Sequence, residues 1–274
     1  MICWICRKNE ANSREHKFKA SILKKAYGKK FENVFSTDNQ RVPNNKYNDK
    51  ILKFEKNICN VCNESLTRDS DDAFDLFYEY FNNSYSKIVE EKFFDYKSIF
   101  GENWSEQKIN FYRFIAKHAG CKIIDSNYNR IEDLADFVYK KEYCNNFFVA
   151  FQIKPFIKYY SDYYNNQNRG KKYVHLFNSE TYYYKTNNDF ISFAGWTTIK
   201  NLSIIWIYSN EIVPEKCMNF GLNKEEILTK TSIEYENFYS IMNDRVESLL
   251  HFLEFGKKEV LNSDMIDFFK NLIK

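Results

Sequence analysis

Apolar residues recur at helical spacing along much of the first half of the chain and again near its end. In Ser21–Tyr27 the apolar residues Ile22, Leu23 and Ala26 are three and four positions apart, which predicts a helix that Gly28 would end. The same spacing predicts further helices over residues 63–81, 86–121, 131–141, 225–255 and 263–273. Gly101 predicts a break within the longest helical stretch of the first half.

Strand signals concentrate in the second half of the chain. Phe147–Ile153 is an apolar run of strand length and predicts a buried strand. Further strands are expected in four other segments: residues 15–18, 51–58, 173–184 and 190–208. Asn201 is expected in a hairpin turn, and residues 37–49 are expected to form a polar loop. Helices combined with several consecutive strands predict an α+β fold.

Composition narrows the class of protein. The chain has 274 residues and 44% of them are hydrophobic, which is enough for a sizeable core and excludes disorder of the whole chain. The length suggests two parts, residues 1–85 and 86–274. No apolar run approaches the ~18 residues that cross a bilayer, and Met1–Arg14 lacks the apolar core of a signal peptide. We therefore expect a cytoplasmic protein without a membrane partner.

Charge is divided unevenly along the chain. The net charge is +3, but residues 1–70 contain 15 basic and 8 acidic residues, whereas the remainder contains 25 and 29. This asymmetry is typical of a module that contacts nucleic acid. The cations to which we assign phosphate contacts are Arg14, Lys17, Lys19, Lys24 and Lys25. The alternative interpretation is an ordinary solvated helix face.

Cysteine spacing gives the strongest chemical signal. Cys3–Cys6 and Cys59–Cys62 are two CxxC pairs, and the odd total of 7 cysteines argues against a disulfide framework. Four thiolates from two such pairs predict a closed tetrahedral site for a structural Zn²⁺. Closing the long loop between the pairs costs about 4 kcal/mol, and zinc capture supplies ~10–16 kcal/mol in small zinc domains. The other cysteines are expected to be small buried apolar residues: Cys121, Cys144 and Cys217.

Three polar residues lie close to these cysteines in the sequence. Glu15 and His16 are adjacent in the segment between the two pairs, and Asn63 directly follows Cys62 at the start of a predicted helix. A neutral imidazole can accept a proton near neutral pH, and Mg²⁺ prefers oxygen ligands. These residue types suit metal-assisted hydrolysis of a phosphodiester bond.

The order CxxC, Glu-His, CxxC-Asn resembles the zinc-containing branch of the HNH endonucleases over roughly the first 80 residues. The resemblance implies a zinc-stapled ββα-metal module in residues 1–85, followed by a mixed helical and antiparallel-strand part. It implies that His16 activates water, and that Glu15 and Asn63 hold a catalytic Mg²⁺ or Mn²⁺. The expected activity is endonucleolytic cleavage of nucleic acid, with DNA as the expected substrate.

One position departs from the pattern of this family. Phe54 occupies the place of the family's middle asparagine, and Asn48 and Asn57 are near it but out of register. The orienting role of that asparagine has therefore moved to another residue or is missing. The alternative function is a non-catalytic zinc-dependent module that binds nucleic acid or protein.

Residues 86–274 carry no catalytic motif. Their many tyrosines, for example Tyr182–Tyr184, are interpreted as core packing or, beside lysines, as stacking platforms for single strands. Our hypothesis is that this part selects the substrate or regulates the nuclease, and that it could join two copies of the chain or bind a partner protein.

Overall fold

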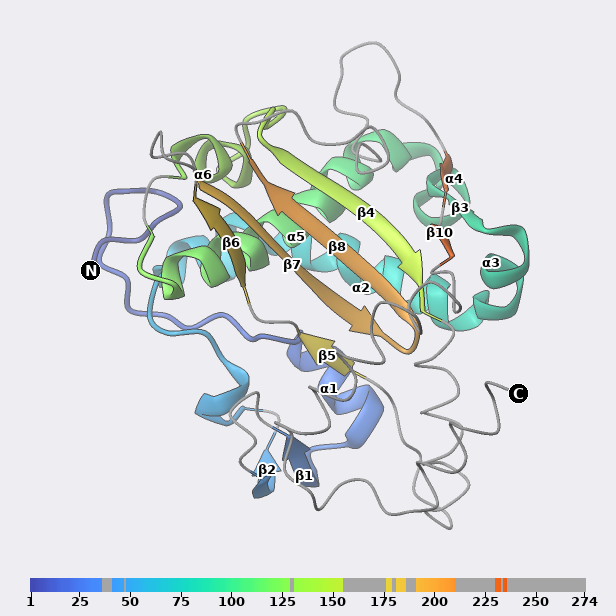
Figure 1. The fold of residues 1–274 in the computed structure, drawn as a ribbon, viewed down its shortest axis with the longest axis horizontal. Helices are drawn as coiled ribbons and strands as arrows, with labels where there is room; N and C mark the ends of the chain where they lie inside the picture. Colours follow the sequence, from blue (N-terminus) through green and yellow to red (C-terminus); the bar gives the residue numbers. More distant parts are fainter. Residues whose placement is uncertain are drawn as a thin grey trace.

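The chain forms a six-stranded sheet with helices packed on one face (Figure 1). The structure is a computed structural model and describes residues 1–35, 41–46, 48–128, 131–154, 176–178, 181–185, 191–209, 230–232 and 234–235. In Figure 1 the two long helices lie behind the strands, and the N-terminal segment passes below the sheet. The helices and the mainly antiparallel sheet confirm the predicted α+β class.

The sheet is built around one long hairpin. β7 (Ile191–Ile199) and β8 (Leu202–Tyr208) pair antiparallel through the two-residue turn Lys200–Asn201, which confirms the turn predicted at Asn201. β4 (Phe147–Ile153) pairs antiparallel with β8 along its whole length. The remaining strands of this sheet are β5 (Leu176–Asn178), β6 (Tyr182–Lys185) and β10 (Glu234–Tyr235). Both β5 and β6 pair with β7, and β10 runs parallel to β4.

The side chains of β4 show how the sheet contacts the helices. Every second residue of this strand is buried, beginning with Phe147, so one face of the strand is apolar. The Phe151 ring lies 6.1 Å from the Phe111 ring and 6.3 Å from the Phe77 ring, measured between centroids. The predicted buried strand is confirmed, and its apolar face forms the floor of the core.

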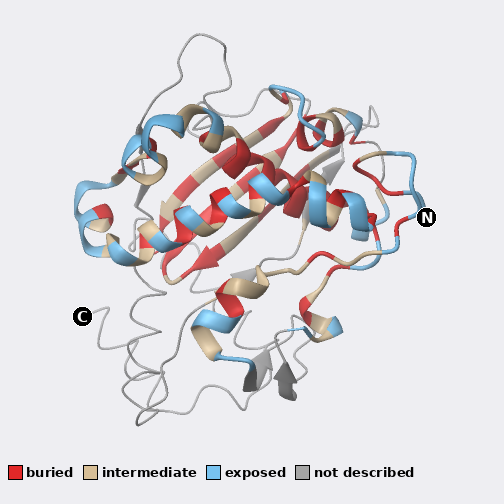
Figure 2. Ribbon diagram, turned by 180° about the vertical axis from the view of Figure 1, so that it is seen from behind, coloured by how far each residue is buried: buried red, intermediate tan, exposed pale blue. Residues whose placement is uncertain are grey.

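Two long helices cover this floor. α5 (Trp104–Asp125) is central, and every residue from Asn110 to Ile124 is buried. α2 (Arg68–Asn83) packs against α5 with an apolar face that includes Phe74 and Phe77, while its outer face is exposed (Figure 2). α6 (Glu132–Val138) packs against the other side of α5. Because neighbouring elements enclose α5, this helix forms the centre of the hydrophobic core.

Short elements connect α2 with α5. They are α3 (Tyr85–Glu91), β3 (Phe93–Asp95), α4 (Tyr96–Phe100) and the 3-10 turn η3 (Gly101–Asn103). The helix predicted over 86–121 is therefore broken by a strand as well as at Gly101, whose φ of 68° ends α4. β3 finds its partner in β9 (Lys230–Ser232), far away in the sequence, which local spacing cannot indicate.

The segment between the two cysteine pairs contains little regular structure. It holds α1 (Ala20–Tyr27), β1 (Lys30–Phe35), β2 (Arg41–Lys46) and the 3-10 turn η1 (Lys50–Leu52). α1 is the helix predicted there, and it ends at Gly28 with a φ of 82°. After the second pair, the π-helix η2 (Val61–Leu66) leads into α2.

Three local predictions in this segment are wrong. Residues 15–18 form no strand, and His16 makes only an isolated bridge to Lys53. Residues 51–58 start with η1 and continue with two isolated bridges, so they are no strand either. The loop predicted over 37–49 contains β2, which pairs antiparallel with β1. Residues 15–18 and 51–58 nevertheless run side by side, because the Phe54 N–H donates to Glu15 O and the Lys17 N–H donates to Leu52 O.

The C-terminal predictions fall mostly outside the described residues. The helix predicted over 225–255 is wrong at residues 230–232 and 234–235, which form β9 and β10 by pairing with strands distant in sequence. Its other residues, the helix predicted over 263–273 and Cys217 lie outside the described part. Among the described helices, none has the length and apolarity needed to cross a membrane.

The core is continuous across the predicted division of the chain. A single cluster of buried apolar residues extends from Cys3 to Tyr208, and it includes Phe77 on one side of residue 85 and Phe111 on the other. Cys121 and Cys144 are buried members of this cluster, as predicted. The assignment of residues 1–85 and 86–274 to two domains stays a prediction, but their described residues share one core.

Candidate metal centre

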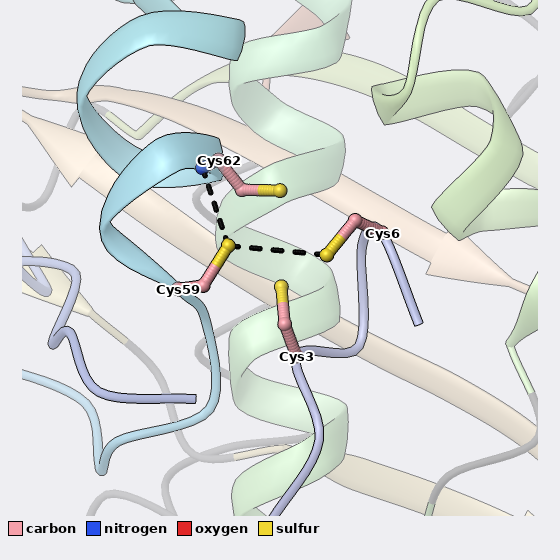
Figure 3. Close-up of side chains that lie close together, drawn as sticks. All are labelled: Cys3, Cys6, Cys59 and Cys62. Carbon is pink, nitrogen blue, oxygen red and sulfur yellow. Dashed lines mark hydrogen bonds between the residues drawn. The ribbon is translucent and has the colours of Figure 1, made fainter. Parts of the chain in front are cut away.

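The two CxxC pairs come together at one point. The sulfur atoms of Cys3, Cys6, Cys59 and Cys62 all lie within 4.8 Å of one another, and we call these four residues the sulfur cluster. Figure 3 shows the first pair on the N-terminal loop and the second pair at the start of the helical segment, with α5 behind them. Three of the four cysteines are buried and Cys6 is half-buried. The predicted pairing of the CxxC motifs is confirmed.

The spacing of the sulfurs fits a zinc ion. Cys6 Sγ lies 3.9 Å from Cys59 Sγ, and a tetrahedron with Zn–S bonds of about 2.3 Å has edges of roughly 3.8 Å. Hydrogen bonds to Cys59 Sγ come from the Cys62 backbone N–H at 3.4 Å and the Asn9 side-chain amide at 3.6 Å. Hydrogen-bond donors to a sulfur stabilise it as a thiolate ligand. Four such cysteines could bind a structural metal ion such as zinc.

Crowding of the thiols changes their acidity. A hydrogen bond with Cys62 lowers the pKa of Cys3 to about 4. The same bond, together with burial, raises the pKa of Cys62. One thiol therefore ionises at the expense of its neighbour, and a bound cation would allow both to ionise.

Trp4 anchors the sulfur cluster to α5. It lies inside the first CxxC pair and is 6% exposed. Its ring occupies the space beside Gly120 so closely that a Cβ added to Gly120 would lie 2.2 Å from the ring. Only glycine permits this approach, so a residue of the second part of the chain is fitted to the first cysteine pair.

A buried ion pair lies next to the predicted catalytic residues. Glu15 Oε2 is 2.9 Å from the Lys117 ammonium, which is also 2.9 Å from Asp71 Oδ1 and donates to Thr67 Oγ1 at 3.3 Å. We call Glu15, Thr67 and Asp71 the oxygen cluster. Lys117 is fully buried, and Glu15 is 7% exposed. The structure thus gives Glu15 a different partner from the predicted divalent ion.

Electrostatics keep this pair charged. Burial would lower the pKa of Lys117, but the two neighbouring carboxylates raise it above its ordinary value. Burial likewise opposes ionisation of Glu15, but Lys117 and His118 hold its pKa well below the usual range. For Asp71 the effect of burial exceeds that of Lys117, and its pKa is raised. Both carboxylates lie 2.9 Å from the ammonium, and Glu15 is the more deeply buried of the two.

His118 completes the surroundings of Glu15. Its Nε2 lies 3.6 Å from Glu15 Oε1, and its ring packs 4.4 Å from the Phe114 ring and 5.9 Å from the Phe54 ring. His118 is 8% exposed and lies within α5. Both carboxylate oxygens of Glu15 therefore face cationic or polar groups of α5.

The structure brings Asn63 to the segment that carries His16. Asn63 lies in η2, and its Nδ2 donates to Ser13 Oγ at 3.0 Å. The backbone of Ser13 in turn forms a bridge with Ile58. Asn63 and His16 are both half-buried. Of the three predicted catalytic residues, Glu15 faces α5, and Asn63 is tied to the loop that leads to His16.

Phe54, at the place of the family's middle asparagine, and the nearby Asn57 both belong to the buried interior, whereas Asn48 is exposed. Phe54 is 2% exposed and belongs to the core, and its backbone N–H donates to Glu15 O at 2.8 Å. Asn57 is buried and turns to α5, where its Nδ2 donates to Cys121 O at 3.1 Å and to Asp125 Oδ1 at 2.9 Å. Asn57 therefore holds the second cysteine pair against α5.

The predicted phosphate-binding cations divide into two kinds. Arg14 pairs with Glu55 at 2.7 Å, and Lys19 pairs with Asp75 at 2.8 Å, so the chain itself already neutralises both. Lys24 and Lys25 are exposed on α1. Lys17 is half-buried. Among these five cations, the two exposed ones are therefore the lysines in the last turn of α1.

One small cavity lies near these groups. The cavity beside His118 and Phe114 has a volume of about 30 Å³ and an apolar lining, so it suits at most a water molecule. A groove of about 480 Å³ lies at the start of α5, but three carboxylates line it. With three carboxylates against the single cation Arg113 in its lining, this groove would repel a phosphate backbone.

Sequence reasoning missed Lys117, His118 and Asp71. The signal that could have indicated them is the pair Lys117-His118 within the stretch 114–121, whose other residues are apolar or glycine, since a buried charge requires a partner. Comparison with known proteins adds no relatives. No family model matches the chain, and neither a curated protein nor a solved structure matches it.

Proposed function

We propose that the N-terminal segment, residues 1–85, is a zinc-stapled nuclease module that hydrolyses phosphodiester bonds, with DNA as the expected substrate. The observation that carries this proposal is the convergence of four thiols from two CxxC pairs. Near this cluster, Asn63 Nδ2 donates to Ser13 Oγ, three residues before His16, and the backbone of His16 forms a bridge with Lys53. Such an arrangement is what the resemblance to zinc-containing HNH endonucleases implies.

The chemistry assigns one role to each group. His16 accepts a proton from the attacking water, the water oxygen bonds to phosphorus, and the bond to the leaving sugar oxygen breaks. Asn63 donates to Ser13 through Nδ2, so its amide oxygen is the atom suited to a cation. Asn63 would hold Mg²⁺ or Mn²⁺ together with substrate phosphate oxygens, and the ion would supply stabilisation of negative charge. Glu15 is no longer assigned as a ligand, because Lys117 binds its carboxylate.

Binding of the substrate is assigned to exposed cations. Lys24 and Lys25 lie in the last turn of α1 without burial, and they can contact phosphates independently of sequence. Affinity should therefore fall as salt concentration rises.

The test is a cleavage assay with the zinc-loaded full-length protein on double-stranded DNA, single-stranded DNA and RNA, with Mg²⁺ or Mn²⁺. We expect His16→Ala and Asn63→Ala to lower cleavage by about 100-fold while zinc content stays unchanged. Asn60→Ala is the matched control, because Asn60 is an exposed residue of the same helical segment. Undiminished cleavage by His16→Ala would remove His16 from its role.

A non-catalytic zinc-dependent binding module is the second candidate. The burial of Glu15 in an ion pair with Lys117 favours it, because one predicted catalytic carboxylate is engaged in structure. This candidate predicts salt-sensitive binding of nucleic acid and full zinc content without cleavage of any of the three substrates. The same assay therefore separates the two functions.

A further inference from the structure

The Lys117 ammonium is held in the way that a metal ion is held by oxygen ligands. Three oxygens surround it, and they come from three elements: Glu15 from the N-terminal segment, Thr67 from the end of η2 and Asp71 from α2. The Nζ–O distances to the two carboxylates are both 2.9 Å. An ammonium has three N–H donors, so three acceptors satisfy it completely.

We propose that Lys117 is a tethered cation that takes the place of a divalent ion at Glu15, so that Glu15 coordinates no exchangeable metal in this protein. The lysine side chain is 0% exposed and rises from the buried helix α5. It therefore cannot leave the oxygen cluster without opening the core. A second cation at the same oxygens would meet the repulsion of a fixed positive charge at close range.

The Glu15 side of the oxygen cluster is shielded from solvent more than the Asp71 side, as expected if no metal ion enters there. The Asp71 side chain is 23% exposed, whereas the Glu15 side chain is 9% exposed. The side of the cluster that contains Glu15 is closed by His118 at 3.6 Å and by the backbone N–H of His16, which donates to Glu15 Oε1 at 3.1 Å. Each Glu15 oxygen thus has a partner from the chain itself.

This inference goes beyond the proposed function, because metal binding tests it and cleavage does not. A protein without nuclease activity would still have Lys117 as its internal cation. Conversely, a divalent ion held by Asn63 and substrate would leave the inference intact, since it does not involve Glu15.

The first measurement is a titration of the zinc-loaded full-length protein with Mn²⁺. The electron paramagnetic resonance signal of free Mn²⁺ reports how much is bound. We expect Glu15→Gln to leave Mn²⁺ affinity unchanged. Removal of a true ligand would weaken it by at least about tenfold. A loss of that size would overturn the proposal.

The second measurement uses Lys117→Ala, which removes the ammonium and leaves the oxygens. We expect this variant to gain Mn²⁺ affinity by about tenfold or more over the wild type, and the double variant with Glu15→Gln to lose the gain. Lys117→Arg keeps the positive charge and should behave as the wild type does. A folded Lys117→Ala protein without a gain that depends on Glu15 would overturn the proposal. If Lys117→Ala does not fold, the Glu15→Gln result decides.

Discussion

The sulfur cluster and the oxygen cluster both lie against α5, and their negative charge is balanced in opposite ways. The sulfur cluster gathers four thiols, and the described hydrogen bonds to Cys59 Sγ come from neutral amides. The oxygen cluster gathers two carboxylates and a hydroxyl around the ammonium of Lys117. The first arrangement therefore suits a cation from solution, whereas the second contains one covalently. Convergent ligands alone do not define a metal site. The fixed charge nearest to the ligands decides whether a metal ion can bind them.

The largest expected effect comes from breaking the sulfur cluster. Cys62→Ser should abolish stoichiometric zinc and remove on the order of 10 kcal/mol of metal-binding free energy from the folded state. Native mass spectrometry measures the zinc, and hydrogen exchange should show loss of protection around Cys3 and Cys59. Cys121→Ala is the control, because Cys121 is buried outside the cluster. Zinc retained by Cys62→Ser would contradict the comparison.

The oxygen cluster should respond to loss of one partner. Glu15→Gln leaves a buried ammonium with one carboxylate and should lower the free energy of unfolding by about 3–5 kcal/mol. Lys140→Met, which removes the exposed pair with Asp69, should cost less than about 1 kcal/mol. Urea denaturation of both variants measures the difference. Equal effects would show that burial does not strengthen the Glu15–Lys117 pair.

Gly120 joins the sulfur cluster to the helix that carries Lys117. Gly120→Ala places a methyl group into the Trp4 ring and should cost about 1–3 kcal/mol, because the rigid ring cannot withdraw. Zinc affinity should fall with it, since Trp4 lies between two ligands. Combining Gly120→Ala with Trp4→Leu should recover part of the loss in a double-mutant cycle. Strict additivity would argue against the contact.

Lys108 sharpens the comparison, because it is a second buried lysine of α5 in an aromatic setting. Its ammonium lies 4.8 Å from the Tyr96 ring centroid, and burial lowers its pKa from 10.5 to about 8. Between these two values the unfolded chain binds more protons, so stability should rise as pH increases through this range. Lys108→Met should remove this rise and stabilise the protein at pH 7 by about 1–2 kcal/mol. Denaturation curves across this pH range check both signs.

The elements that depend only on a short stretch of chain could be predicted from the sequence. The apolar run at β4, the turn at Asn201 and the spacing in α1 and α2 each specify one element within a short stretch of chain. The second strand of a pair is harder to predict. β2 and β9 contain polar residues, and they form strands because partner strands satisfy their backbone groups: the neighbouring β1 for β2 and the distant β3 for β9.

The candidate site was predictable to the same extent. The two-residue gap within each CxxC pair is itself a signal of a metal site, so the sulfur cluster could be predicted from the sequence. The role of Glu15 could not, because its partner Lys117 lies in a distant helix. From Asn110 to Ile124, α5 is buried all round and lacks an exposed stripe, so sequence spacing does not show which of its polar residues face one another. His16 and Asn63 remain predictions that the proposed assay tests.

Full enclosure of α5 has a practical consequence for dissecting this protein. A fragment that ends at residue 85 would retain every thiol of the sulfur cluster but would lose the surface against which Trp4, Asn57 and Glu15 rest. Those three side chains would then meet water, and the carboxylate would lose its counterion. The N-terminal portion is therefore not an independent unit that could be moved to another protein. The structure that supports it includes α5, which comes later in the chain.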